Sequence, residues 1–232
     1  MPSWGIHMLV AIKLSPKLKV DRNSFIFGNI VPDINNGYVV KGISKIVKHE
    51  KTHFDSSYSK RIIENLEENE FLIKYKNKMN NPIVLGYLAH MLTDRYFNYI
   101  AYKKRAIYDK ENNVIGIILN NKKIMYDEFD EIRKVKVNDF KIFSKYIYDN
   151  KLVKKLEYNK EFVIKNELIE EVEIDKKDVG LTIKYINDNI QGTKDILKTC
   201  KELEYKIFTQ EELIKITNDC CKFILEYINK NI

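Results

Sequence analysis

The chain is poor in the residues that punctuate turn-rich folds. Its 232 residues include only 8 glycines and 4 prolines. A fold with many tight turns needs more of both, because these residues supply the backbone angles that such turns require. The sequence therefore predicts an all-α fold, with helices joined by short polar links.

Cysteine and long apolar runs are also scarce. The three cysteines, Cys200, Cys220 and Cys221, are odd in number and lie near the end of the chain, so they suggest no disulfide framework. No apolar run approaches the roughly 18 residues of a transmembrane helix. The first 14 residues lack the basic start and the unbroken apolar stretch of a secretory signal. We therefore expect a cytoplasmic protein without a transmembrane segment.

Charge of either sign is not concentrated in one block. The 40 Lys and Arg residues exceed the 33 Asp and Glu residues, which gives a formal net charge of +7. A basic excess favours nucleic acid or an anionic membrane as a partner when the basic residues cluster. Here they alternate with acids, as on a solvated surface, so nucleic acid stays an alternative partner. The oligomeric state is left open.

Helical periodicity marks the elements. Trp4, Met8, Ala11 and Leu14 lie at helical spacing, and Pro16 is expected to end that first helix. A helix that is apolar on nearly every side is expected over about 82–102, with Pro82 in its first turn. We expect one domain over residues 1–232, built around this central helix as a multi-helix bundle.

The remaining segments are assigned by the same rules. Further helices are expected over about 57–69, 127–148, 176–190 and 209–230. The last begins with Thr209-Gln-Glu-Glu212, a capping-box pattern. The apolar run 114–119 is ambiguous between strand and helix, and the segment 150–175, rich in Lys and Glu, is expected to be peripheral. Residues 101–232 thus form a helical C-terminal part without histidine.

The histidines are confined to the first 90 residues. The chain has 4 histidines, namely His7, His49, His53 and His90. Asp94 follows His90 by four positions, so the two side chains share one stripe of the central helix. A buried carboxylate is stable only when it is paired or bound to a metal. The two residues are therefore either a hydrogen-bonded core pair or part of a metal site.

A metal site within residues 1–100 is favoured because several separate segments carry suitable groups. Zinc binds imidazole and carboxylate groups, and catalytic sites keep an open position for water or substrate. Asp33 directly follows Pro32 at the boundary of an element. The candidate ligands are His7, Asp33, the His49/His53 pair, His90 and Asp94.

The order of four motifs resembles the bacterial zinc-dependent phospholipase C family, which is related in fold to the S1/P1-type zinc nucleases. The motifs are Trp4-Gly-Ile-His7, Gly28-Asn-Ile-Val-Pro-Asp33, Lys51-Thr-His-Phe54 and Gly86-Tyr-Leu-Ala-His-Met-Leu-Thr-Asp94. The resemblance covers roughly the first 100 residues. It implies an all-α fold and a zinc cluster that hydrolyses phosphoesters.

Carried over by position, the resemblance assigns roles to five residues. It implies that His53 and His90 hold one zinc, that Asp94 bridges, and that His7 holds the neighbouring zinc. Asp33 would act as a ligand or as the general base for the attacking water. The substrate would be a phosphodiester, phospholipid-like or other.

The chain departs from the family in two ways. Secreted members bind zinc through an N-terminal tryptophan, whereas Trp4 is internal here. The family's third zinc uses a histidine six positions beyond the helix aspartate, where this chain has Ile100. We therefore expect one or two zinc ions.

Two alternatives remain. His49-Glu50-Lys51-Thr52-His53 matches H-E-x-x-H, in which two histidines bind zinc and the glutamate activates water for peptide hydrolysis. A zinc protease is thus one alternative, and a catalytically degenerate helical binding protein of the same fold is the other. Trp4 either packs in the core or lines a choline pocket through its ring face.

Overall fold

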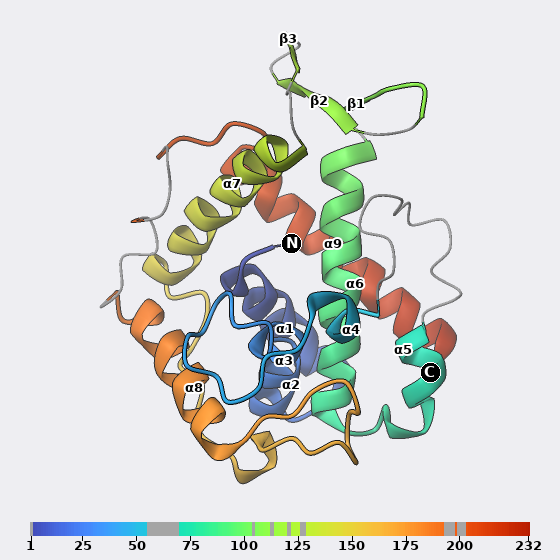
Figure 1. Ribbon diagram of the computed structural model, residues 1–232, viewed down its shortest axis with the longest axis vertical. Coiled ribbons are helices and arrows are strands. Elements are labelled where there is room, and N and C mark those ends of the chain that lie inside the picture. Colours follow the sequence, from blue (N-terminus) through green and yellow to red (C-terminus); the bar gives the residue numbers. More distant parts are fainter. Residues whose placement is uncertain are drawn as a thin grey trace.

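The computed structural model describes residues 2–54, 70–103, 105–111, 114–119, 122–125, 129–192, 198 and 203–232, and the chain is mostly helical (Figure 1). The helices are α1 (Trp4–Leu18), α2 (Arg22–Gly28), α3 (Val31–Ile34), α4 (His49–Thr52), α5 (Glu70–Tyr75), α6 (Pro82–Lys103), α7 (Phe129–Asp149), α8 (Lys176–Ile190) and α9 (Gln210–Asn231), with 3₁₀ turns η2 (Lys76–Lys78) and η3 (Lys160–Phe162).

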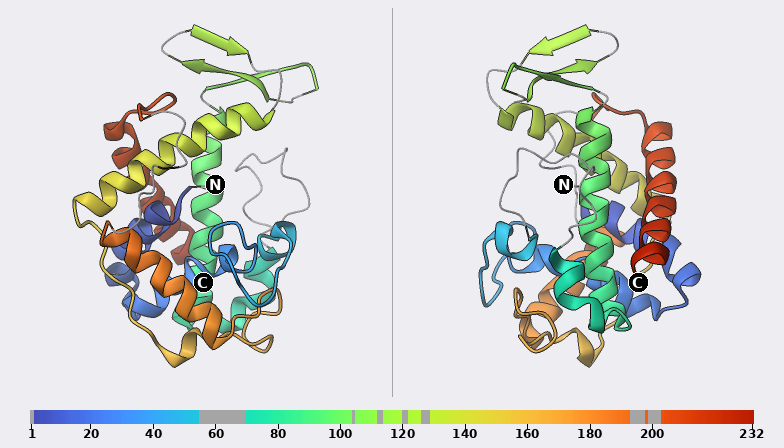
Figure 2. Two further views of the ribbon diagram at one scale, coloured as in Figure 1. Left: turned by 60° about the vertical axis from the view of Figure 1, so that its left-hand side comes forward. Right: turned by 90° about the vertical axis from the view of Figure 1, so that its right-hand side faces the viewer.

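The central helix is present where the sequence predicts it. Helix α6 runs through the middle of the molecule, with α1, α2 and α9 packed against it (Figures 1 and 2). The bounds of α7, α8 and α9 also lie close to the expected ranges, and Thr209 and Glu212 form the expected capping box. The helix expected over 57–69 lies outside the described residues.

Helix α1 continues through Pro16, so the expectation that this proline ends it is wrong. Proline has no N–H for the carbonyl oxygen of Ile12, one turn before it. The Ser15 hydroxyl donates to that oxygen instead, at 3.4 Å. The helix ends at Leu18, and the following Lys19 adopts a left-handed conformation with φ of 55° and donates its N–H to the Ser15 carbonyl. A side-chain substitute for the lost hydrogen bond therefore allows one more turn.

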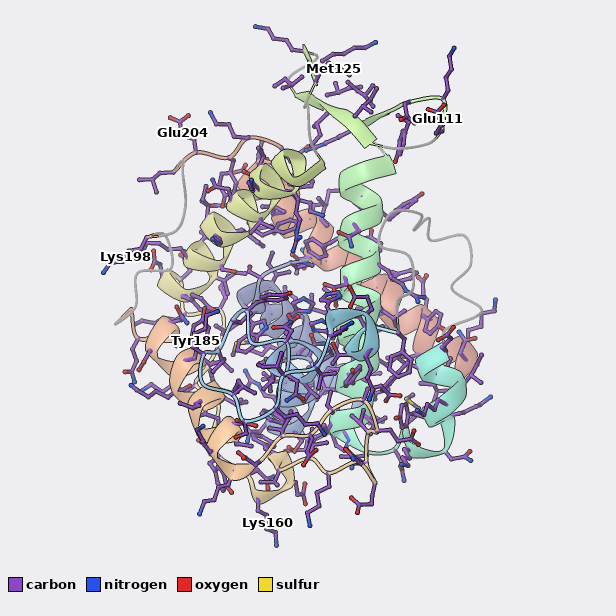
Figure 3. The ribbon with its side chains drawn as sticks, in the orientation of Figure 1. Glu111, Met125, Lys160, Tyr185, Lys198 and Glu204 are labelled. Atoms are coloured by element: carbon purple, nitrogen blue, oxygen red, sulfur yellow. The ribbon has the colours of Figure 1, made fainter. Side chains whose placement is uncertain are left out.

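The all-α expectation is too strict, because the chain also forms a small antiparallel sheet. Its strands are β1 (Ala106–Tyr108), β2 (Val114–Leu119) and β3 (Lys122–Met125), in that spatial order. The sheet stands beyond the end of α6 (Figure 2), and Met125 and Glu111 project away from the helices (Figure 3). The ambiguous run 114–119 is rich in β-branched residues, which favour strands.

Segment 150–175 contributes to the core, so the expectation that it is peripheral is wrong. Phe162 is buried and stacks on Phe27 of α2, with ring centroids 4.0 Å apart. Ile164 and Ile174 are paired in an antiparallel bridge, and both are buried. The buried hydrophobic side chains form one cluster with members from α1 through α9. Among the described residues, no helix combines the length and apolarity needed to cross a bilayer.

Helices α2 and α6 approach unusually closely because glycine lies on both sides of the contact. Gly28 of α2 lies against the backbone of Ile83, and Gly86 of α6 lies against the backbone of Phe25 and Asn29. A Cβ atom at either glycine would overlap with a backbone carbonyl oxygen. The close approach places Asn29 beside α6, where it contacts His90.

Replacing Gly86 by alanine should therefore destabilise the protein by about 1–3 kcal/mol, the usual cost of overpacking a core. The free energy of unfolding in urea measures this. Gly180 of α8 is the matched control, because a Cβ there would meet nothing within 4 Å. Gly180→Ala should stabilise the helix by about 0.5–1 kcal/mol. Equal stability of the two variants would contradict the close-contact explanation.

Candidate metal centre

The five residues that the sequence singled out converge in the interior. His7 comes from α1, Asp33 from α3, His53 from the end of α4, and His90 and Asp94 from α6. All are buried, with exposed fractions between 0% and 7%. Residues far apart along the chain thus meet where water has little access.

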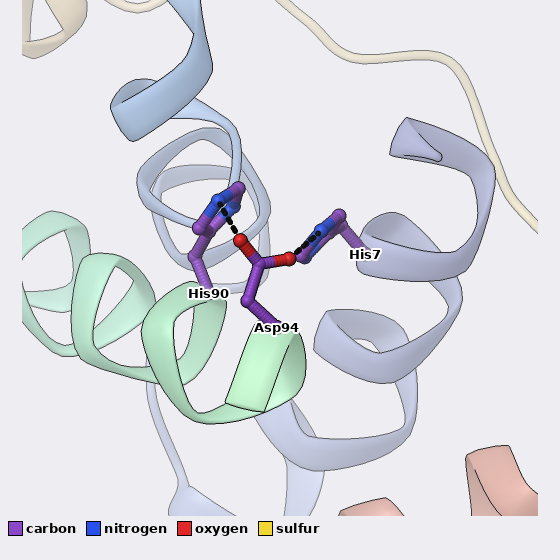
Figure 4. A group of neighbouring side chains, drawn as sticks. All are labelled: His7, His90 and Asp94. Atoms are coloured by element: carbon purple, nitrogen blue, oxygen red, sulfur yellow. Dashed lines mark ion pairs between the residues drawn. The ribbon is translucent and has the colours of Figure 1, made fainter. Parts of the chain in front are cut away.

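Asp94 lies between two imidazole rings and presents a different oxygen to each (Figure 4). Its Oδ1 is 3.3 Å from His7 Nε2. Its Oδ2 is 3.7 Å from both His90 Nε2 and His53 Nε2. Within the described residues, neither His7 Nε2 nor Asp94 Oδ1 has a hydrogen-bond partner of acceptable geometry. Buried polar atoms without a hydrogen bond are uncommon, and a metal ion is one explanation for them.

Asp94 Oδ2 belongs to a group of ligand atoms from four residues, namely Asp33, His53, His90 and Asp94. His53 Nε2 lies 3.2 Å from His90 Nε2 and 3.5 Å from Asp33 Oδ1. His90 Nε2 is 4.0 Å from Asp33 Oδ2. A tetrahedral zinc ion with ligands at about 2.0–2.2 Å holds its ligand atoms about 3.3–3.6 Å apart. The separations around this group are close to that range, so the residues fit a zinc ion.

The outer nitrogens of three rings face oxygen atoms. Nδ1 lies 2.9 Å from the Asn29 carbonyl oxygen in His90, 3.1 Å from the Asn29 side-chain oxygen in His7, and 3.2 Å from the His49 carbonyl oxygen in His53. The two Asn29 oxygens only accept, so Nδ1 carries the hydrogen in His90 and His7. His53 Nδ1 also lies 2.9 Å from the Thr52 hydroxyl, which can donate or accept. In the neutral forms of His90 and His7, Nε2 is then an acceptor. Acceptor nitrogens thus face carboxylate oxygens, an arrangement that a cation satisfies and that hydrogen bonds alone do not.

Burial keeps two of the imidazoles neutral. It lowers the pKa of His53 to about 3, although Asp33 raises that pKa and His90 lowers it further. Burial likewise lowers the pKa of His90 to about 4. For Asp94, burial opposes ionisation, but the adjacent rings of His90 and His7 hold its pKa below the ordinary value. Neutral imidazole and ionised carboxylate are the forms that bind metal.

The stacking of the His7 and His90 rings bears on how many metal positions the centre has. The rings of His7 and His90 are stacked 4.0 Å apart and nearly parallel, at 9°. Each imidazole directs its nitrogen lone pair within the plane of its ring. A nitrogen of His7, a nitrogen of His90 and an oxygen of Asp94 all lie within 4.8 Å of one another. An ion shared by the two stacked rings would lie outside the plane of at least one of them, so the stacking favours two different positions on either side of the Asp94 carboxylate.

His49 is a further metal-capable residue near the centre. A nitrogen of His49 lies within 4.8 Å of ligand atoms of both Asp33 and His53. Its ring is stacked on His53, with centroids 3.6 Å apart and planes at 9°. This stacking does not fit the shared ion of an H-E-x-x-H site, and Glu50 is exposed. The geometry therefore disfavours the protease alternative.

Three residues outside the predicted ligand set, Trp4, Asn29 and Asn36, hold the ligands in place. The Trp4 indole donates to Asp33 Oδ2 at 3.1 Å, and the Asn36 amide donates to Asp33 Oδ1 at 3.0 Å. Trp4 is buried, so its ring face does not line an open choline pocket. Asn29 orients both His7 and His90. The motifs that contain Trp4 and Asn29 were the only sequence signal for these contacts.

The chain was compared with family models, with curated proteins and with solved structures, and it matches none of them.

Proposed function

We propose that this protein is a metal-dependent phosphoester hydrolase with a zinc centre of two positions. Asp33, His53, His90 and Asp94 Oδ2 would hold one ion, and His7 with Asp94 Oδ1 would hold the other. The observation that supports this most strongly is the two-sided Asp94 carboxylate between stacked, differently directed histidines. The motif resemblance to zinc-dependent phospholipase C favours the same class.

The side chains of this chain would hold the metal ions and orient the ligands that bind them. Bound zinc supplies Lewis acidity, which lowers the pKa of coordinated water to about 7 and stabilises charge on a phosphoryl oxygen. Asn29 fixes the rings of His7 and His90, and Trp4 and Asn36 fix Asp33. Because both oxygens of Asp33 already accept hydrogen bonds, we assign Asp33 as a ligand first and as the general base second.

We further propose that the substrate is a phosphodiester, phospholipid-like or other, and that the enzyme acts in the cytoplasm. Nucleic acid is the alternative substrate, since it contains the same phosphodiester group. The buried thiols of Cys220 and Cys221 are compatible with a reducing compartment.

Metal analysis and one substitution test the function. Protein purified without an affinity tag and supplied with zinc should retain one or two ions after dialysis, by elemental mass spectrometry. It should hydrolyse bis(p-nitrophenyl) phosphate, and chelation should abolish the activity. Glu50→Gln should leave zinc content and phosphodiesterase activity unchanged, because Glu50 is exposed.

Other outcomes would favour the alternatives. Peptide hydrolysis that disappears in Glu50→Gln would indicate the protease. Failure to retain zinc would indicate a helical protein with a degenerate site.

A further inference from the structure

One side of the centre is more exposed to solvent than the others, and this side lies at Asp94. The side chain of Asp94 is 10% exposed, compared with 3% for Asp33 and 4% for His53. The side chains of His7 and His90 are fully buried. A ligand that reaches the centre would therefore approach along the face of α6 that carries Asp94.

The next turn of that face carries Asn98, four residues after Asp94 and on the same stripe. Helix α7 crosses α6 near its C-terminal end (Figure 2). There Lys136 of α7 donates from Nζ to Asn98 Oδ1 at 2.8 Å. The approach to the centre is thus bordered by an amine.

Lys136 is an unusual residue for this position because only 3% of it is exposed. Lysine is almost never fully buried unless its charge is used or compensated. Burial lowers the pKa of Lys136 to about 7, while attraction to Asp94 raises it and repulsion from Arg133 lowers it. The hydrogen bond to Asn98 places the amine about one helical turn beyond Asp94.

A buried amine can bind a phosphate oxygen strongly. A charge-assisted hydrogen bond is about twice as strong as a neutral one, and a site with little water increases the attraction. Arg133 lies three residues before Lys136 on α7, so the two cations lie on one side of the helix. The positive charge that Asn98 binds, one helical turn beyond Asp94, is suited to an anion that is itself held by metal.

We propose that Lys136, oriented by Asn98, binds a non-bridging phosphate oxygen of the substrate beside the Asp94 side of the centre. This inference rests on the proposed function insofar as the anion is a phosphoester. Lys136 would set the specificity for a phosphoryl group and would orient it toward the centre.

Titration with inorganic phosphate tests the proposal. Isothermal titration calorimetry is run on metal-free and on zinc-loaded protein, with Lys136→Met and Lys136→Gln as neutral variants. Phosphate affinity should fall about tenfold or more in both variants, as expected for a lost charge-assisted hydrogen bond. Zinc content should stay at the wild-type level, because Lys136 is not assigned as a ligand.

Lys134→Met is the matched control, since Lys134 is an exposed residue of the same helix. Its phosphate affinity should stay within about twofold of wild type, because an exposed charge is screened by water and salt. Thermal melts monitor folding. If the neutral Lys136 variants do not fold, Asn98→Ala gives the same comparison, because it removes the group that orients the amine.

The outcomes separate this inference from the proposed function. Unchanged phosphate affinity in folded Lys136 or Asn98 variants would overturn the inference, and so would a wild-type protein that binds no phosphate in either state. If phosphate binding depends on Lys136 while zinc analysis finds no metal, the anion site stands and the proposed enzyme does not. A purely structural Lys136 would lower the melting temperature without changing the phosphate affinity of the folded protein.

Discussion

Replacing Asp94 by asparagine is expected to reduce the zinc content by at least one ion and to abolish most phosphodiesterase activity. The carboxylate presents Oδ1 to His7 and Oδ2 to His53 and His90. Asparagine has an NH₂ group in place of one oxygen, and this group donates hydrogen bonds and cannot bind metal. Activity should fall by more than the roughly 10- to 100-fold that losing an outer partner of a ligand costs.

Zinc binding by the variant is measured at the same time by elemental analysis and by melting temperature. A ligand that binds only the folded state stabilises it by about 4 kcal/mol at 1,000 times its dissociation constant. Wild-type protein should therefore melt at a higher temperature with zinc, and Asp94→Asn should lose most of this gain.

Asp139 provides the control for Asp94. It is a buried aspartate outside the centre, and it accepts hydrogen bonds from the backbone N–H groups of Lys206, Ile207 and Phe208. Asp139→Asn leaves fewer acceptors for these groups and should cost about 1–3 kcal/mol of stability. Its folded form should still bind zinc as wild type does. If Asp94→Asn retains the full zinc content, Asp94 does not bridge two positions.

The sequence predicts those helices whose start is marked by a local residue pattern. Helix α6 begins at Pro82, and α9 begins with a capping box, so both starts are encoded within one turn of chain. The convergence of His7, Asp33, His53, His90 and Asp94 was predicted from residue type, helical spacing and motif order. Spacing alone placed His90 beside Asp94, because that relation is local.

The remaining features depend on contacts between distant segments. The hydrogen bonds of Asn29 to two histidines exist because Gly28 and Gly86 let α2 and α6 come close, which no local pattern encodes. The rule that proline ends a helix also does not take account of the Ser15 hydroxyl, which replaces the hydrogen bond lost at Pro16. The sheet was missed because its strands are short and their periodicity is weak.

Acidification of the metal-free protein is expected to lower its free energy of unfolding substantially. An unfolded histidine takes up a proton near its ordinary pKa of 6.5, whereas folded His53 and His90 do so only near about 3 and about 4, because they are buried. Between these values the unfolded state binds more protons than the folded state. Stability therefore falls as the pH falls, by at most about 1.4 kcal/mol per pH unit for each histidine.

The prediction is checked by urea unfolding with a chelator present, between pH 7 and pH 4. The free energy of unfolding should decrease steadily toward acid below the unfolded histidine pKa, whereas the slope near pH 7 also contains the titration of buried Lys136. His90→Gln should retain only the slope that belongs to His53, since glutamine does not titrate. Bound zinc should oppose the loss, because the ion and the proton compete for the same Nε2 atoms. A stability that does not change between pH 6.5 and pH 4 would mean that these rings are not buried in the neutral form, and the metal centre would lose its electrostatic basis.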